Sequence, residues 1–489
     1  MYSLVALMLF IGDNFPDRFN APYPDSRPNI IMIVVDHLKP ALGCYGDTLA
    51  QTPNIDRLAH SSFIFENNHS QHIAVSSSRA SLMTGKRPDY IMVWDVNTPI
   101  RKMISDIMTM PQYFRENGYE TAAIGKIFDP GSVDDLHDSL SWSIPYNISA
   151  VNTSKAEFLD HMNTGSLNEG PEVSDYETQD GKIARESIRQ LDRLARQDKP
   201  FFMAVGFHKP GLPFVAPGKY WELFSRKDIV PPPFQKAAAG TPGWIYQAPG
   251  VSSRRNEHLP EKLTRSASGQ KELIHGYYAC VSFIDHHIGS IVSHLETKGE
   301  LENTIIIICG DQGMHLGDHG IWFEPTNLEE ATRTPLIISY GSRYRGRTGA
   351  PTELLDIFPT LCELTRINSP ESADGKSLIP LMTGNVKNVK DYAVSQNKRL
   401  EDFMAYAFRD ERYRYVVWLK NNFRSYMNFS ANLIVASELY DYVKDPMETV
   451  NLIEHTAYKD VVRKFEYWST NFFIDQEKSQ SKGSFLFNE

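Results

Sequence analysis

Asn29-Ile30-Ile31-Met32-Ile33-Val34-Val35-Asp36-His37 is the stretch that decides the fold class. Six consecutive apolar residues, ended by an acidic one, are typical of a strand buried on both faces of a parallel sheet. Similar short apolar runs recur at 201–206, 304–309 and 336–339. Helical patterns lie between these runs. The alternation predicts an α/β fold with helices on both faces of a mostly parallel sheet.

The clearest helical pattern lies between residues 271 and 296. From 214 to 270, by contrast, the sequence is rich in proline and glycine, which predicts a long loop that shapes a cleft. Apolar side chains of the helical pattern recur every three or four residues and form one stripe, made of Leu273, Tyr277, Val281, Ile284, Ile288, Ile291 and Leu295.

The chain divides near residue 385. Beyond it, short runs separated by turn residues precede a helical pattern at 458–473, which predicts a small antiparallel α+β domain over 386–489. Residues 28–385 then form the main domain, and 1–27 form a weak signal segment with a leader. The short C-terminal runs are 404–408, 413–418 and 438–442.

Composition excludes several classes of protein. With 489 residues, of which 41% are hydrophobic, the chain can fill a sizeable core. Fifty basic against sixty acidic residues give a net charge of −10, so no nucleic-acid partner is expected. The only apolar N-terminal run is too short to cross a bilayer, so no stable membrane insertion is expected. The four cysteines are too scattered for a disulfide framework.

Acidic residues directly follow two of the predicted strands. Asp36-His37 follows the first, and Asp311-Gln312-Gly313 follows the run at 304–309. Ligands of open α/β sheets bind at the carboxyl ends of the strands. Two carboxylates from different strands can converge there on one divalent cation, and Gln312 can add a carbonyl oxygen. For either aspartate alone, capping of the next helix is the better interpretation, and only the two together favour a metal site, so that alternative stays open.

Several motifs follow one another in order between residues 28 and 452, and together they resemble the sulfatase family of the alkaline-phosphatase superfamily. Two further motifs, Gly206-Phe207-His208-Lys209-Pro210 and Tyr277-Tyr278-Ala279-Cys280-Val281-Ser282, are most similar to the iduronate-2-sulfatases of that family. The shared motifs include Leu42-Gly43-Cys44-Tyr45-Gly46, Thr52-Pro53-Asn54-Ile55-Asp56-Arg57-Leu58, Arg79-Ala80-Ser81-Leu82-Met83-Thr84-Gly85, Gly125-Lys126, Gly310-Asp311-Gln312-Gly313 and Leu316-Gly317-Asp318-His319-Gly320.

The resemblance implies an alkaline-phosphatase-like fold and hydrolysis of sulfate esters with one Ca²⁺ and a formylglycine made from cysteine. It implies a sulfated sugar as substrate, from heparan or dermatan sulfate fragments, and a lysosomal or secreted destination. The family's metal positions correspond to Asp36, His37, Asp311 and Gln312.

The resemblance also implies roles for three basic residues. Arg79 orients the nucleophile loop and shields the metal charges, and Lys126 contacts the sulfate and the aldehyde hydrate. His208 donates to the sulfate, although a purely structural histidine is the open alternative. Ser76 is the candidate for the nucleophile position in this chain.

The chain departs from the family pattern at that position. The family carries Cys-x-Pro-Ser-Arg, whereas this sequence reads Ala74-Val75-Ser76-Ser77-Ser78-Arg79, which contains no cysteine. Either one residue is missing between Val75 and Ser76, or the deletion is real and one of these two residues occupies the site. There are three further departures. His37 stands where the family usually has a second acidic ligand, and its nitrogen is a poor partner for a hard cation. Asp129 and Glu324 stand where a His and a Lys are expected, which adds negative charge or removes positive charge beside a dianionic transition state.

Three functions therefore remain open. The first is an iduronate-2-sulfatase-like hydrolase. The second is a catalytically degenerate sulfatase that binds a sulfated glycan or a partner without turnover. The third is a zinc phosphodiesterase of the same superfamily, in which His315 and His319 add nitrogen ligands.

Overall fold

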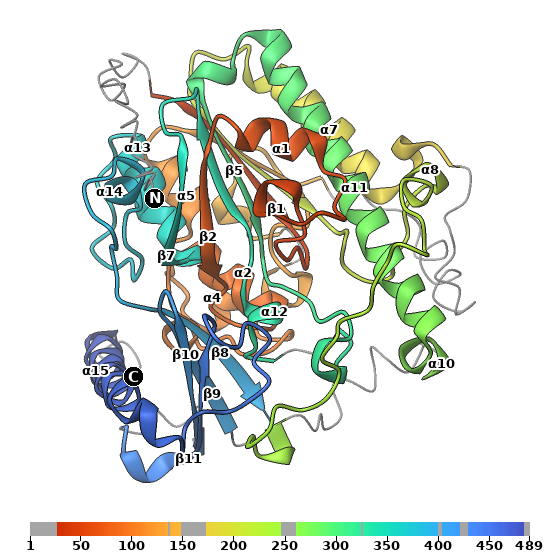
Figure 1. The fold of residues 1–489 in the computed structure, drawn as a ribbon. Coiled ribbons are helices and arrows are strands. Elements are labelled where there is room, and N and C mark those ends of the chain that lie inside the picture. Colours follow the sequence, from red (N-terminus) through yellow and green to blue (C-terminus); the bar gives the residue numbers. More distant parts are fainter. Residues whose placement is uncertain are drawn as a thin grey trace, which may run out of the picture.

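The computed structural model describes residues 27–134, 137–147, 173–245, 261–323, 326–399, 403–420 and 429–483. The larger of its two sheets has seven strands in the order β3-β4-β1-β5-β6-β2-β7 (Figure 1). Four of these strands correspond to the predicted apolar runs, whereas β2, β3 and β7 were not predicted. The strands are β1 Asn29–Val35, β2 Phe63–His69, β3 Glu120–Gly125, β4 Phe201–Phe207, β5 Thr304–Gly310, β6 Leu336–Tyr340 and β7 Gly346–Glu353.

The central strands end level with one another. β3, β4, β1 and β5 are parallel, and β6 is antiparallel to both of its neighbours. In the register, Val35 at the end of β1 lies opposite Phe207 of β4 and Gly310 of β5. The residues that follow these three strands therefore leave the sheet at the same edge, which is where ligands of such sheets bind.

Helices cover both faces of this sheet and build one core on each side (Figure 1). Alternate residues of β1 enter different cores: Ile31 and Ile33 enter one, Ile30 and Met32 the other. This confirms the predicted sandwich. The first core is covered by α1 Pro53–Ala59, α7 Gln179–Leu194 and α11 Ala267–Lys298, and the second by α2 Val75–Thr84, α5 Met110–Glu116, α13 Ile357–Leu364 and α14 Ile379–Met382.

The predicted helix at 271–296 is the central part of α11, and its apolar stripe is buried. The helix begins after Ser266, whose Oγ accepts a hydrogen bond from the Gly269 N–H, and it ends at Gly299 with a φ of 72°. The predicted loop at 214–270 is interrupted by α8 Gly218–Trp221 and α10 Glu261–Arg265, while 246–260 lie outside the described residues.

The second sheet is antiparallel and has the order β11-β10-β9-β8. β9 and β10 contain the predicted runs 404–408 and 413–418, β11 contains the run 438–442 except its last residue, and β8 was not predicted. Its apolar face packs against α15 Lys459–Gly483 through three phenylalanines, Phe465, Phe472 and Phe473. The strands are β8 Ala393–Arg399, β9 Phe403–Arg409, β10 Tyr413–Lys420 and β11 Ile434–Asp441. The domain boundary near 385 stays a prediction.

Three further helices are short: α3 Pro88–Ile91, α4 Ile100–Met103 and α12 Glu329–Thr332. Among the described residues, none of the helices has the length and apolar character that a membrane crossing requires. The predicted leader, apart from Arg27, lies outside the described residues.

Candidate active site

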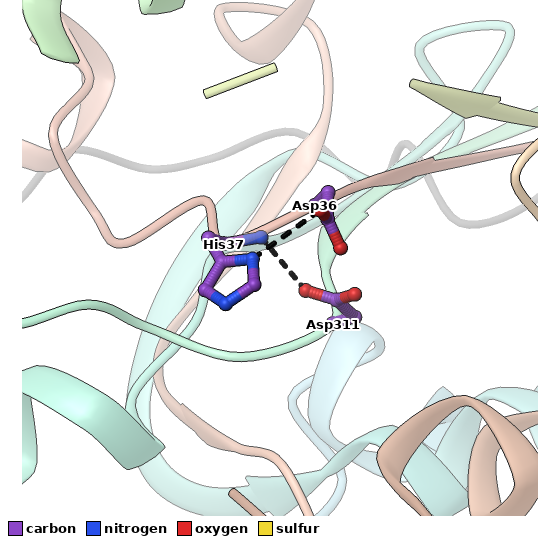
Figure 2. A group of neighbouring side chains, drawn as sticks. All are labelled: Asp36, His37 and Asp311. Carbon is purple, nitrogen blue, oxygen red and sulfur yellow. Dashed lines mark hydrogen bonds and ion pairs between the residues drawn. The ribbon is translucent and has the colours of Figure 1, made fainter. Parts of the chain in front are cut away.

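Three buried side chains meet where β1 and β5 end, namely Asp36, His37 and Asp311 (Figure 2). Each offers a ligand atom, and these atoms lie within 4.8 Å of one another. The His37 backbone N–H donates to Asp311 Oδ1 at 2.8 Å, and its Nδ1 lies 3.3 Å from Asp36 Oδ2. His37 has a φ of 57°, in the left-handed region that few residues other than glycine adopt, and its hydrogen bond to Asp311 stabilises this conformation.

Two basic side chains face the acidic pair. Arg79 is fully buried; its Nε donates to Asp311 Oδ2 at 2.7 Å, and its Nη2 lies 3.6 Å from Asp36 Oδ1. Lys126 directly follows β3, and its Nζ donates to Asp36 Oδ1 at 2.9 Å. Two formal negative charges thus meet two formal positive charges.

The two carboxyl groups are shifted in opposite directions. Burial by itself raises the pKa of Asp36, but Lys126 and His37, together with Arg79, more than offset this and hold that pKa well below its ordinary value. Burial raises the pKa of Asp311 even though Arg79 opposes the shift. Neighbouring carboxyl groups with opposite shifts are a frequent feature of functional sites.

Gln312 adds an amide to this cluster. Its Nε2 lies 2.8 Å from His37 Nε2, while its Oε1 is buried and has no hydrogen-bond partner among the described residues. A buried carbonyl oxygen without a partner needs an explanation, and a cation beside it is one. Two carboxylates and an amide oxygen are the donors that hard divalent cations prefer, so these residues fit a metal ion.

His208 follows β4 at the same edge. Its backbone N–H and that of Lys209 donate to the two carboxylate oxygens of Asp180, at 2.8 and 3.0 Å. Burial, together with the positive charge of Lys126, lowers the pKa of His208 to about 3, so its ring is neutral at neutral pH. The same turn brings Gly211 so close to Asp36 that a Cβ there would lie 2.5 Å from Oδ2.

The three serines before Arg79 begin α2, and each hydroxyl donates to a backbone carbonyl. Ser76 Oγ donates to the carbonyl of Asp95 at 2.9 Å, and Ser77 donates to that of Val93. Ser78 donates to the carbonyl of Asp311 at 2.5 Å. The hydroxyl hydrogen of Ser76, the predicted nucleophile, is therefore directed at the Asp95 carbonyl, which is not a base that can take it up.

Asp129 and Glu324, the other two residues that depart from the family pattern, are not both placed by the structure. Asp129 caps the short helix that follows it, because its Oδ1 accepts from Gly131 N–H at 3.1 Å. Glu324 lies outside the described residues. For the zinc alternative, His315 already uses both ring nitrogens, one with Asp318 and the other with Thr326 Oγ1 at 2.7 Å.

Sequence reasoning missed three residues that shape the site: Ser78, Asp180 and Gly211. Ser78 lies in the segment 74–79 discussed above, but the sequence does not show which of its three serines contacts Asp311. Asp180 has no sequence signal that connects it with His208. Gly211 stands in Lys209-Pro210-Gly211-Leu212-Pro213, where a glycine between two prolines is a usable sign of a tight turn.

Comparison with known proteins adds family information to this geometry. The profile described as Sulfatase matches residues 28–367, and that described as N-sulphoglucosamine sulphohydrolase, C-terminal, matches 317–470. The chain is 32% identical to an iduronate 2-sulfatase from Mus musculus, with 88% of this chain and 91% of the relative covered. It is 31% identical, with the same coverage, to an iduronate 2-sulfatase from Homo sapiens.

Solved structures share the fold. One is a protein in complex with its substrate D-glucosamine-2-N,6-O-disulfate, with a TM-score of 0.70, 20% identity and coverage of 94% of this chain and 99% of that one. Another is a phosphonate monoester hydrolase of Agrobacterium radiobacter, with a TM-score of 0.70, 22% identity and coverage of 92% and 96%. Because the family profile matches more than half of the chain, over residues 28–367, and 91% of each of the two relatives is covered, the chain belongs to the sulfatase family.

Proposed function

We propose that this protein binds one calcium ion and hydrolyses sulfate esters of glycosaminoglycan fragments, in the manner of an iduronate-2-sulfatase. The observation that carries the proposal is the buried cluster at the ends of β1 and β5, in which Asp36 and Asp311 face Arg79 and Lys126. These four charges sum to zero. A divalent cation would leave the site with a net charge of +2, which suits a negatively charged sulfate ester.

Asp36, Asp311 and Gln312 would hold the ion through oxygen, and His37 would add a nitrogen. A bound divalent cation supplies Lewis-acid polarisation of a sulfuryl oxygen. Calcium is proposed because oxygen donors predominate in this set.

The basic residues have distinct roles in the proposal. Arg79 holds the Asp311 carboxylate in one orientation through the 2.7 Å bond. Lys126 is the only one of the two cations with partial exposure, so it would donate to a sulfate oxygen from its place beside Asp36. His208, neutral at working pH, would donate one N–H to the ester. A donor aimed at the developing charge contributes about 3 to 4 kcal/mol, or two to three decades in rate.

Ser76 is the nucleophile in this proposal. Its Oγ would form a bond to sulfur while the bond between sulfur and the sugar oxygen breaks, and the hydroxyl proton would pass to that oxygen, which leaves as an alcohol. An ordinary hydroxyl performs only this first half of the reaction, because it lacks the second hydroxyl with which a hydrated formylglycine expels sulfate. A cysteine restored between Val75 and Ser76 would supply the missing group only after its oxidation to formylglycine, whose hydrate carries two hydroxyls.

One observation favours a second candidate function, a sulfated-glycan-binding protein without turnover. All three serine hydroxyls of the segment donate to backbone carbonyls, so among the described residues none of them is hydrogen-bonded to a side chain that could act as its general base. Such a protein would bind sulfated sugar through Lys126, His208 and the cation.

Location and domain organisation follow the same proposal. The relatives are named iduronate 2-sulfatases, which supports a lysosomal or secreted destination for this chain. We place the division between the main and C-terminal domains at 385/386, between α14 and β8.

Two measurements test the function. Mass spectrometry of the tryptic peptide 58–79 from the native source determines whether residues 74–79 carry an additional, modified cysteine. Release of sulfate from a 2-O-sulfated, iduronate-bearing disaccharide then separates the candidates. Calcium-dependent turnover that is lost in Lys126→Ala supports the hydrolase. Tight binding of the disaccharide with no sulfate released contradicts it and supports the binding protein.

A further inference from the structure

Helix α12 lies between the C-terminal sheet and the candidate active site. On the site side, the Gly313 N–H donates to the carbonyl of Ala331 at 2.9 Å. A Cβ on Gly313 would overlap the carbonyl oxygen of Glu330, so only glycine lets the turn after β5 approach the helix so closely. The Glu330 side chain pairs with Lys39, which lies three residues after Asp36.

The same helix also holds the end of β2, which leads into the nucleophile segment. The Ser70 N–H donates to the carbonyl of Thr332 at 2.9 Å, and the hydroxyl of Thr332 lies 3.3 Å from His69 Nδ1. Just beyond α12, the Thr334 N–H donates to the carbonyl of Asn68 at 3.0 Å. Through these contacts α12 touches three of the segments that carry the candidate site, namely those after β1, β2 and β5.

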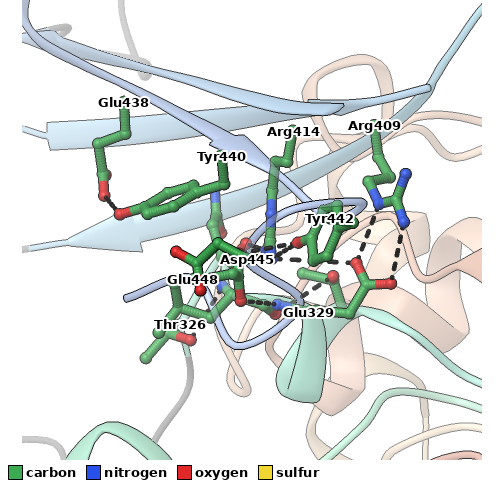
Figure 3. A network of polar contacts seen from close by, with 12 residues as sticks. Thr326, Glu329, Arg409, Arg414, Glu438, Tyr440, Tyr442, Asp445 and Glu448 are labelled. Atoms are coloured by element: carbon green, nitrogen blue, oxygen red, sulfur yellow. Dashed lines mark hydrogen bonds and ion pairs between the residues drawn. The ribbon is translucent and has the colours of Figure 1, made fainter. Parts of the chain in front are cut away.

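The C-terminal part of the chain holds the other side of α12 (Figure 3). Glu448 Oε2 accepts the Glu329 N–H, the first of the helix, at 3.0 Å. Arg409 on β9 donates to both carboxylate oxygens of Glu329, at 3.1 and 3.4 Å. Arg414 on β10 pairs with Glu448 and also donates to the carbonyl of Asn327, just before the helix.

This network is buried and ionised. Arg414 and Glu448 are 1% and 3% exposed, and Tyr442 donates to Glu448 Oε1 at 2.8 Å. Burial alone would raise the pKa of Glu329, but Arg409 and His69, with Arg414, hold it well below its ordinary value. Charge-assisted hydrogen bonds in a dry interface are the strong ones, and removing one partner leaves a buried charge unpaired.

We infer that Glu448, Arg414 and Arg409 are positioning residues: they fix α12, and α12 fixes the turn that carries Asp311 and Gln312. The C-terminal sheet thereby sets the geometry of the metal-binding set without touching it. The claim that these residues fix the backbone of the turn after β5 does not depend on calcium. The claim that they affect calcium affinity rests on the proposed function.

The test compares two near-isosteric variants of the full-length protein. Glu448→Gln cannot accept from both Arg414 and the Glu329 N–H. The matched control is Glu438→Gln, which alters a buried glutamate on β11. Its hydrogen bonds are with Trp418 and Tyr440 and not with α12, and Arg414 acts on it only through its charge. Amide hydrogen exchange is followed in peptides that cover 310–314 and 68–72, with calcium and with chelator, and calcium affinity is measured by titration calorimetry.

In Glu448→Gln we expect exchange at Gly313 and Ser70 to accelerate at least about tenfold and calcium to bind about 10- to 100-fold more weakly. In Glu438→Gln both quantities should stay within about twofold of the wild type. Equal effects of the two variants, or faster exchange confined to the C-terminal sheet in Glu448→Gln, would overturn the inference.

A milder variant guards against loss of folding. Arg409→Lys keeps the charge but cannot pair with both oxygens of Glu329, so a smaller acceleration in the same two peptides is expected. If the wild type binds no calcium, the proposed function fails, while the exchange experiment still decides whether the C-terminal sheet positions the turn. Unchanged exchange in both Glu448→Gln and Arg409→Lys would refute the positioning role.

Discussion

Replacing Arg79 by methionine removes the one fully buried cation beside the acidic pair while keeping an apolar side chain of comparable length. The guanidinium lies 2.7 Å from Asp311 and 3.6 Å from Asp36, and it also donates to the carbonyl of Ile127 at 3.2 Å. At an effective dielectric constant of about 20, each charge pair is worth about 5 kcal/mol before desolvation is subtracted. Desolvation offsets a large part of this, and breaking a buried pair typically costs about 3 to 5 kcal/mol.

We therefore expect Arg79→Met to lower the free energy of unfolding by about 3 to 5 kcal/mol, measured by urea denaturation with chelator present. The control is Arg57→Met, which breaks a pair with Glu296 at 2.5 Å whose side chains are 50% and 36% exposed. Solvent screens that pair, so its loss should cost less than about 1 kcal/mol. Similar losses in both variants would refute the reasoning, because burial would then not distinguish the two pairs.

Two further predictions concern the turn after β4 and the response to acid. Gly211→Ala places a Cβ against Asp36 and should weaken calcium binding at least about tenfold in calorimetry; Gly243→Ala, where a Cβ meets nothing within 4 Å, should leave it unchanged. Burial lowers the pKa of both His69 and His72 to about 3, so the unfolded chain binds more protons below about pH 6.5. The free energy of unfolding should therefore fall as the pH falls from about 6.5 to 3, by up to about 2 kcal/mol per histidine between pH 6.5 and 5. In urea denaturation at several pH values, His72→Gln should reduce the slope of this free energy against pH, and an unchanged slope would contradict the prediction.

The sequence was sufficient to predict the strands that are apolar throughout. β1 and β5 are buried on both faces, so their composition alone distinguishes them from helices and loops. β2 was missed because its second half, Glu66 to His69, is polar, although its last three residues are buried. Asn68, for example, donates to the carbonyl of Thr334 beyond α12 and accepts from the Thr352 hydroxyl of β7. β7 carries glycine and proline at a sheet edge, where neither excludes a strand.

The candidate site likewise has features that the sequence could predict and features that it could not. Asp36 and Asp311 could be predicted to converge because each follows a central strand, and level strand ends are a property of parallel sheets. The hydrogen bonds of Ser76, the approach of Gly211 and the link through α12 could not be predicted. Each depends on segments that are far apart in the chain, and the geometry between them is set by packing and not by local sequence.

Calcium titration of the wild type and of Asp311→Asn, followed by calorimetry at fixed ionic strength, tests the central claim most directly. The account predicts one ion bound per chain in the wild type and a loss of affinity of at least about 100-fold in the variant, because a charged ligand is removed from a buried set. The absence of binding to the wild type, or an affinity that Asp311→Asn leaves unchanged, would contradict the claim that the acidic pair at the ends of β1 and β5 holds a metal ion.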